Sequence, residues 1–369
     1  MPQNKSHHFV PQFYLRKFGV GNSVSLFNIE QMKPVPRAPI SGQCQRDYLY
    51  GRDAKAEQKI GKLEDECARV MAQIIHAGVL PQRGSKEHRL LVEFALLQRS
   101  RTPAAGKATE ESMQRALEFE VSGGPPPTDL DPDNIKINWK NSKLFNIEAN
   151  VPIAPAMMDL AMKLLINESG VEFITSDSPV VVVNQWCMGD PKDYSTVMAA
   201  SGIELFLPLS PQFAVLFYDK KIYNVGRPGS EVVLVKNPVD VRSINGLQLL
   251  TADTNLYGKI DLEEFKKLPG HWRGMKNDKL LIQRLVSTDG KYQKINQYKL
   301  QPDINLKLSF VRIVQAMKQI PTSVKRKMHR YPPVVLERIL KPLFFPNGMP
   351  ERPQESARYV LVEEKQETV

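Results

Sequence analysis

The sequence has few cysteines and no long apolar run. Its three cysteines, Cys44, Cys67 and Cys187, lie far apart and form no CxxC pair, which argues against a disulfide framework or a cysteine-built zinc site. No apolar stretch approaches the roughly 18 residues of a membrane span, and the first residues lack the apolar core of a signal peptide. We therefore expect a cytoplasmic protein that has no membrane partner.

Nucleotide-binding motifs and internal repeats are also missing. There is no GxxxxGK[ST] and no GxGxxG that opens a helix, so a Walker-type or Rossmann site has no support. What is present is ordinary for a globular protein: 42% hydrophobic and 24% charged residues, over a length of 369 that suits two domains.

The positive charge belongs to one segment. The chain nets +10, and residues 259–330 hold 17 Lys or Arg against 6 Asp or Glu, a net +11, so the remainder nets −1. This segment predicts contact with nucleic acid, and the nucleic-acid-binding residues we expect are the cluster Lys325, Arg326, Lys327 and Arg330. A solvated basic face without a partner is the alternative.

Hydrophobic spacing predicts an α+β fold with a helical N-terminal half, followed by a largely antiparallel sheet and a basic C-terminal segment. Residues 24–28 read as a strand and the proline-spaced residues 32–40 as extended chain. Apolar residues at three- and four-residue spacing predict helices, and short β-branched runs separated by turn residues predict strands. The expected helices are 54–76, 86–101, 104–121, 154–168 and 241–258, and the expected strands are 171–177, 179–184, 204–210, 213–219, 221–225, 231–236 and 308–314.

The pattern divides the chain into four parts. Glycine, proline and aspartate crowd into residues 122–134, which predicts a loop or hinge. The expected parts are a helical region at 1–121, that hinge, a mixed α/β core at 135–258 and a basic region at 259–369.

The stretch HHFVPQFYLRKF, residues 7–18, resembles the N-terminal signature of the bacterial and phage-encoded family catalogued as domain of unknown function 4238. Four further pieces are similar, in the family's order, over about residues 5–257. The resemblance implies a family without an established activity, and its association with mobile elements implies a role in phage defence or as a toxin. The matching pieces are DYLYGRDAKAEQKIGKLEDE with Tyr50, Glu57 and Glu64, RSRTP at 99–103, FITSDSPVV with LPLSP, and INGLQLLTADTNLY.

His7 and His8 are the first candidate site residues. Side chains alternate faces in extended chain, so one imidazole could face a site while the other braces the fold. Histidine is both a metal ligand and a general base near neutral pH. The structural alternative is that both hydrogen-bond to backbone in an N-terminal strand.

Carboxylates and arginines complete the candidate site. Glu57 and Glu64 share one side of a helix, where Arg99 or Arg101 could pair with them. Asp177 follows a predicted strand at a turn, where binding groups often lie, although an Asx-turn is the structural alternative.

Two function classes follow, with a third behind them. In the first, a metal-dependent nuclease binds Mg²⁺, Mn²⁺ or Zn²⁺ through His8, Glu57 and Asp177. The expected catalytic residues are His7, His8, Asp177 and Arg99, which would activate water and neutralise charge on a phosphodiester. In the second, the chain is a non-catalytic regulator that binds nucleic acid or an acidic protein partner through its basic segment, residues 259–330. In the third, it binds a protein partner through Trp272, Phe344 and Phe345.

Overall fold

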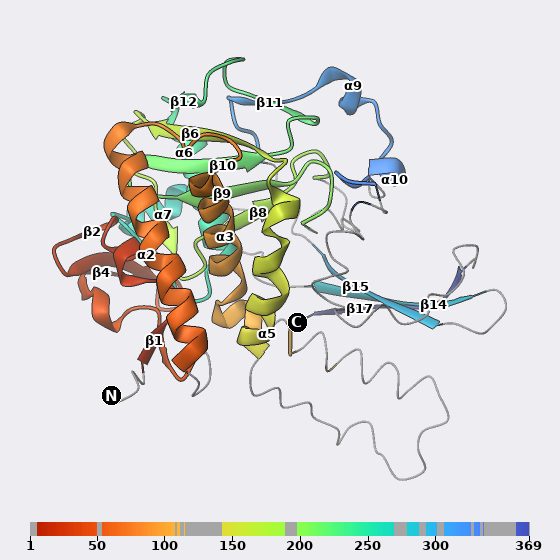
Figure 1. The fold of residues 1–369 in the computed structure, drawn as a ribbon, viewed down its shortest axis with the longest axis horizontal. Coiled ribbons are helices and arrows are strands. Elements are labelled where there is room, and N and C mark those ends of the chain that lie inside the picture. Colours follow the sequence, from red (N-terminus) through yellow and green to blue (C-terminus); the bar gives the residue numbers. More distant parts are fainter. Residues whose placement is uncertain are drawn as a thin grey trace, which may run out of the picture.

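The computed structural model describes the chain over residues 6–49, 54–107, 109–110, 114, 142–188, 198–268, 279–287, 293–300, 306–325, 328–332, 335 and 359–368. Its centre is a five-stranded sheet in the order β12-β6-β10-β9-β8 (Figure 1). Only β12 and β6 pair in parallel, and every other pairing in this sheet is antiparallel. The strands are β6 (Ala161–Asn167), β8 (Val181–Val183), β9 (Glu204–Pro208), β10 (Phe213–Tyr218) and β12 (Val232–Val235).

Side chains of the central sheet alternate between two cores. Leu164 and Val215 enter one core, whereas their neighbours Leu165 and Leu216 enter the other, as the two-residue period of a strand requires. Helices α2 (Ala54–Ala77) and α3 (Lys86–Ser100) cover the first face, and α6 (Pro238–Thr251) covers the second (Figure 1). The fold therefore has a helix–sheet–helix layering.

The prediction of a helical N-terminal half is wrong, because this region is rich in strands. Strand β1 (Ser6–His8) pairs with β5 (Gln45–Asp47). A second sheet joins the short strands of residues 19–39 to two strands from much later in the chain. Its members are β2 (Gly19–Val20), β3 (Ser23–Asn28), β4 (Lys33–Pro39), β7 (Thr175–Ser176) and β13 (Asn255–Tyr257). Prolines in β4 keep this stretch extended, and the first long helix begins at Ala54.

The predicted helix at 154–168 is also wrong. Its first part is a 3-10 helix, η3 (Val151–Met157), and its second part is β6. Pro152 and Pro155 remove two backbone donors, which disfavours a longer helix. The apolar run that follows is central in the sheet, where burial on both faces overrides helix propensity.

Other predictions are confirmed. The helices expected at 54–76 and 86–101 are α2 and α3, and the strand expected at 24–28 is β3. Helix α5 (Ser142–Asn150) packs on α3. The predicted loop 122–134, most of the helix at 104–121, and the anchors Trp272, Phe344 and Phe345 lie outside the described residues.

The remaining described elements are short or belong to the C-terminal part. Strands β11 (Tyr223–Val225) and β16 (Val311–Ile313) form a two-stranded ribbon against the second core. In the described ranges, no helix is long and apolar enough to cross a membrane. The others are α1 (Gln12–Leu15), η1 (Ile40–Gly42), α7 (Leu262–Lys267), α9 (Gln315–Lys318), α10 (Thr322–Lys325), β14 (Lys279–Ser287), β15 (Gln293–Leu300) and β17 (Tyr359–Thr368).

Candidate functional site

His7 lies in β1 and faces the interior. Its side chain is 5% exposed, and Nε2 lies 3.3 Å from Oε2 of Glu57 in the first turn of α2. His8 on the opposite face is half-buried, so the strand shows the alternation that an extended backbone requires. The His7–Glu57 pair ties the first strand to the first long helix.

His8 has a fixed tautomer. Its Nδ1 lies 3.0 Å from the Gln43 carbonyl oxygen, which can only accept, so Nδ1 carries the hydrogen. Its Nε2 lies 2.9 Å from Gln12 Nε2, and the other end of that amide accepts from Arg16 at 3.0 Å. The Arg16 guanidinium can only donate, so the Gln12 NH₂ group faces His8. The Gln12 contact requires a lone pair on Nε2, which together with the hydrogen on Nδ1 makes the imidazole neutral.

Asp177 holds a distant loop. Its Oδ1 accepts from the Asp253 N–H at 2.7 Å, and its Oδ2 accepts from the Thr254 and Asn255 N–H groups at 2.7 and 2.9 Å. Burial raises the pKa of this carboxyl, and the three N–H groups oppose the shift. The carboxylate thus accepts backbone N–H groups, as in the Asx-turn considered from sequence. These groups belong to a loop 76 residues away, however, and not to its own turn.

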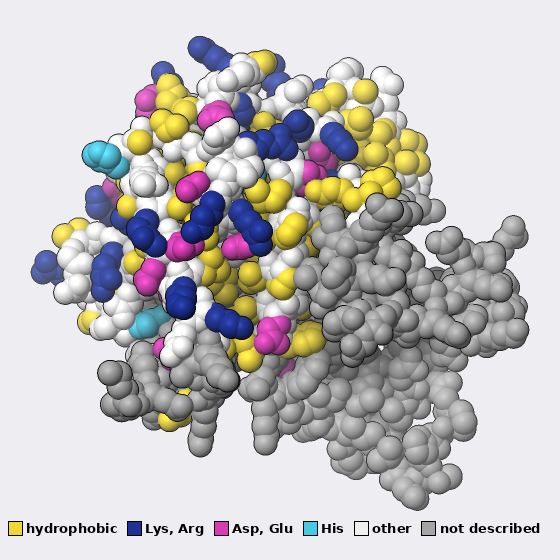
Figure 2. Space-filling model, in the orientation of Figure 1, with side chains coloured by type: hydrophobic (Ala, Val, Ile, Leu, Met, Phe, Trp, Pro, Cys, Tyr) yellow, Lys and Arg dark blue, Asp and Glu magenta, His cyan; other side chains and the backbone are white. Residues whose placement is uncertain are grey.

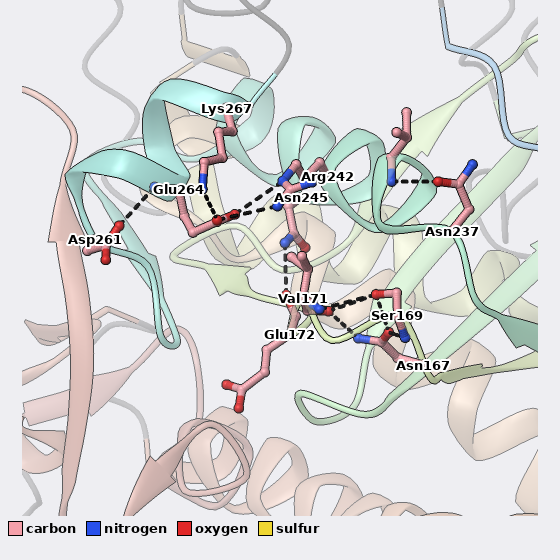
Figure 3. A network of polar contacts seen from close by, with 11 residues as sticks. Asn167, Ser169, Val171, Glu172, Asn237, Arg242, Asn245, Asp261, Glu264 and Lys267 are labelled. Carbon is pink, nitrogen blue, oxygen red and sulfur yellow. Dashed lines mark hydrogen bonds and ion pairs between the residues drawn. The ribbon is translucent and has the colours of Figure 1, made fainter.

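Amide side chains of α6 position the turn that carries Asp177. Asn245 accepts from the Ile174 N–H at 3.1 Å and donates to the Glu172 carbonyl at 2.9 Å. Figure 3 shows this amide beside the ion pair of Arg242 with Glu264, which ties α6 to α7. One turn later, Gln248 accepts from Ser176 and donates to Pro179. The asparagine and glutamine of INGLQ therefore order the threonine-serine-aspartate turn.

The arginines of α3 differ from each other. Arg101 is fully buried, forms an ion pair with Glu64, and donates to the side-chain oxygen of Gln98. Arg99 is half-buried, and burial lowers the pKa of its guanidinium. No described residue forms an ion pair with Arg99. Of the two arginines considered from sequence, Arg101 is the one that pairs with a helix glutamate.

Cys44 lies just before β5 and Tyr257 lies at the end of β13. Sequence reasoning missed both residues. The Cys44 Sγ is 3.2 Å from the Tyr257 hydroxyl. Burial is the main cause that raises the pKa of the Cys44 thiol. Asp177 adds to the rise, and Arg101 opposes it. The two charged side chains are thus close enough to act on one sulfur. A buried, protonated thiol is a packing group and a poor nucleophile.

The expected metal ligands do not form a metal-binding set. In the part of the chain that the structure describes, no three or more His, Cys, Asp or Glu side chains gather as they would around an ion. Glu57 pairs with His7, and both Asp177 oxygens accept backbone N–H groups. These residues do not fit a shared Mg²⁺, Mn²⁺ or Zn²⁺ site with His8.

Two described members of the expected nucleic-acid cluster bind the protein itself. Lys325 donates to the Trp186 carbonyl at 2.8 Å, and its ammonium lies 5.2 Å from the centroid of that indole ring. Arg330 is 4% exposed, forms an ion pair with Asp159, and donates to the Ala156 carbonyl. Arg326 and Lys327 lie outside the described residues.

A different set of cations is exposed along the β11–β16 ribbon. We call this set the basic edge, and it consists of Lys220, Lys221, Arg227, Arg312 and Lys318. None of the five forms an ion pair with a described residue. In contrast, Figure 2 shows basic and acidic side chains interspersed over the face of α2.

Pairing in the ribbon places these cations on one border. Arg312 lies opposite Asn224, and both side chains are exposed. The one acid in residues 219–230 is Asp219, which is buried and accepts from the Gly202 and Lys221 N–H groups at 3.0 Å. No acid occurs in residues 306–325. Glu231, directly after this range, is exposed, so the border is mostly but not wholly positive. It lies on the opposite side of the molecule from β1 (Figure 1).

Comparison with known proteins gives one match. A family model described as "Protein of unknown function (DUF4238)" matches residues 6–261. No curated protein and no solved structure matches the chain. The matched range includes β1, the threonine-serine-aspartate turn and β11, and it ends before β16.

Proposed function

The chain belongs to the DUF4238 family of proteins of unknown function, and from this premise we propose that it is a non-catalytic nucleic-acid-binding protein. The observation that carries the proposal is the basic edge, where five exposed cations lie near only two described acids of the adjoining chain, the buried Asp219 and the exposed Glu231. A row of like charges attracts a polyanion, since each bound phosphate releases a counterion.

The cations of the first half of the edge flank a short strand. Lys220 and Lys221 lie in the turn before β11, and Arg227 lies in the bend after it. The aromatic side chains of this ribbon and its neighbour, Tyr223 and Trp186, are buried. They supply no platform on which bases could stack, so the described edge favours contacts to phosphates over contacts to bases.

Binding to duplex DNA is expected to depend steeply on salt and weakly on sequence. If four of the five cations contact phosphates, log affinity falls with log salt concentration with a slope of about −3.6, because each contact contributes about 0.9. Fluorescence anisotropy with two 20-base-pair duplexes of unrelated sequence, from 50 to 200 mM NaCl, measures both properties. A parent protein that binds neither duplex at 50 mM salt contradicts the proposal.

A nuclease is the second candidate, and one observation favours it. The neutral imidazole of His8 has the form of a general base, although its Nε2 lone pair accepts from Gln12 here and would have to exchange that donor for water. The same binding reactions, run with and without Mg²⁺, Mn²⁺ or Zn²⁺, separate the candidates. Cleaved duplex that disappears in His8→Gln would replace the binding proposal with hydrolysis.

A further inference from the structure

Glu204 is a carboxyl group buried in the sheet behind the basic edge. It lies at the start of β9, with none of its side chain exposed. Its Oε1 and Oε2 accept from Gln185 Nε2 at 2.9 and 3.0 Å, and Oε2 also lies 3.4 Å from the Gln185 N–H. No described cation pairs with it. A buried carboxylate without a cation is costly, so the neutral acid is favoured.

The groups around Glu204 agree with this assignment. Burial is the largest cause that raises its pKa to about 8, and hydrogen bonds from Gln185 and Tyr223 oppose the rise. Tyr223 in β11 is also fully buried, and Glu204, Cys187 and Asp219 each raise the pKa of its phenol. A second buried phenol, Tyr218 in β10, lies directly opposite Glu204 in the β9–β10 pairing, so the ionisable groups around Glu204 include one thiol, two phenols and a second carboxylate.

The Tyr223 hydroxyl connects Glu204 to the basic edge. It accepts from the Trp186 N–H at 2.8 Å, and its single hydrogen is shared between the Gly202 carbonyl at 2.7 Å and Asn184 Oδ1 at 3.2 Å. A protonated Glu204 has its own hydrogen to give to the tyrosine oxygen. An ionised Glu204 has none, so it competes with Gly202 and Asn184 for the tyrosine hydrogen, and the acceptors that lose it are left unsatisfied.

Trp186 carries this connection to the C-terminal segment. Its indole N–H donates to the Met317 carbonyl in α9 at 2.7 Å, and its carbonyl accepts from Lys325 in α10. These two bonds hold the segment that follows β16 and presents Lys318. A disturbance at Tyr223 therefore acts at both sides of the ribbon, through β11 directly and through Trp186 on α9.

We propose that Glu204 is a proton-linked switch of the basic edge, in which the protonated acid holds β11 and α9 in place and its ionisation releases them. The inference rests on the proposed function for its effect on nucleic acid. Release disperses the cations, and the new negative charge behind the ribbon weakens its field. Both effects lower affinity for a polyanion as the pH rises.

The test compares the parent with Glu204→Gln from pH 6.5 to 9. The parent is expected to lose at least about fivefold in duplex affinity across this range, the low end of typical coupling between two sites. Glu204→Gln, whose amide cannot ionise, is expected to keep its affinity within twofold. Glu231→Gln removes an exposed carboxylate beside the same ribbon and is the matched control, expected to lose affinity like the parent.

Hydrogen exchange of the amides in residues 311–325, corrected for intrinsic rates, supplies a readout that needs no nucleic acid. Protection is expected to fall with pH in the parent and to stay constant in Glu204→Gln. If the parent binds the duplex but neither its affinity nor its amide protection changes with pH, the switch is overturned and the proposed function stands. Failure to bind at any pH, with the exchange change present, overturns the proposed function and leaves the switch intact.

Discussion

Asp177→Ala lowers the free energy of unfolding by about 3 kcal/mol, because three part-buried backbone N–H groups lose their acceptor and each costs near the low end of about 1–3 kcal/mol. These donors belong to residues 253–255, which lead into β13 and so join the two ends of the N-terminal sheet. Urea denaturation followed by circular dichroism measures the change. Glu263→Ala, at a carboxylate that is 70% exposed, is the control and changes stability by less than about 1 kcal/mol.

Asp177→Asn distinguishes this structural role from metal binding. Asparagine keeps one accepting oxygen but turns an NH₂ group toward backbone donors, so it too destabilises the fold, by less than alanine does. A metal ligand behaves differently, because its replacement lowers metal content while stability stays constant or rises. Unchanged stability in both variants, with bound metal lost from the second, would contradict the structural role.

Reversal of three cations on the basic edge has the largest expected effect on binding. The triple change Lys220→Glu, Arg227→Glu and Arg312→Glu removes up to three phosphate contacts, which flattens the salt dependence by about 2.7 units. At 0.1 M salt the loss is at least about 100-fold, because each contact contributes nearly one decade of affinity there. Anisotropy titrations over the same salt range as for the parent measure both quantities.

A second triple variant has the same change in net charge and is the matched control. Lys259, Lys266 and Lys267 lie in the basic segment of residues 259–330, but they form ion pairs with Glu172, Glu263 and Glu264, respectively. Their reversal to glutamate is expected to cost less than tenfold in affinity and to leave the slope nearly unchanged. Equal losses in the two variants would mean that net charge alone governs binding, and the basic edge would have no special role.

Local patterns in the sequence predicted the long elements well. Apolar residues at three- and four-residue spacing in α2 and α3 lie against the first core, so their periodicity reports a real amphipathic face. The prediction of a helix over residues 161–167 was wrong for the opposite reason. Strand β6 is buried on both faces, and a continuous apolar run has no period that separates strand from helix.

The candidate site was predictable in part. The family motifs pointed to residues whose side chains support one another, since His7 binds Glu57, and Asn245 and Gln248 hold the turn of Asp177. The motifs could not show that these bonds are internal, because partners such as Asp177 and the 253–255 loop are far apart in sequence. Histidines and carboxylates give the same pattern in a metal site and in a buried hydrogen-bond network.

The basic edge could not be found from charge counts alone. The excess of positive charge in residues 259–330 correctly pointed to the C-terminal part of the chain. However, Arg330 is buried and Lys325 binds Trp186. Three of the five cations of the edge precede that segment, and pairing of β11 with β16 brings them to it across nearly 90 residues. Such long-range pairing is not encoded in any local window.

Hydrogen exchange of the parent chain with and without a 20-base-pair duplex, at low salt, tests the central claim most directly. We expect duplex-dependent protection in residues 219–227 and 306–318, with exchange in residues 6–16 and 54–66 unchanged. Protection centred on β1 and the first turns of α2, around His7 and His8, would contradict the assignment of binding to the basic edge.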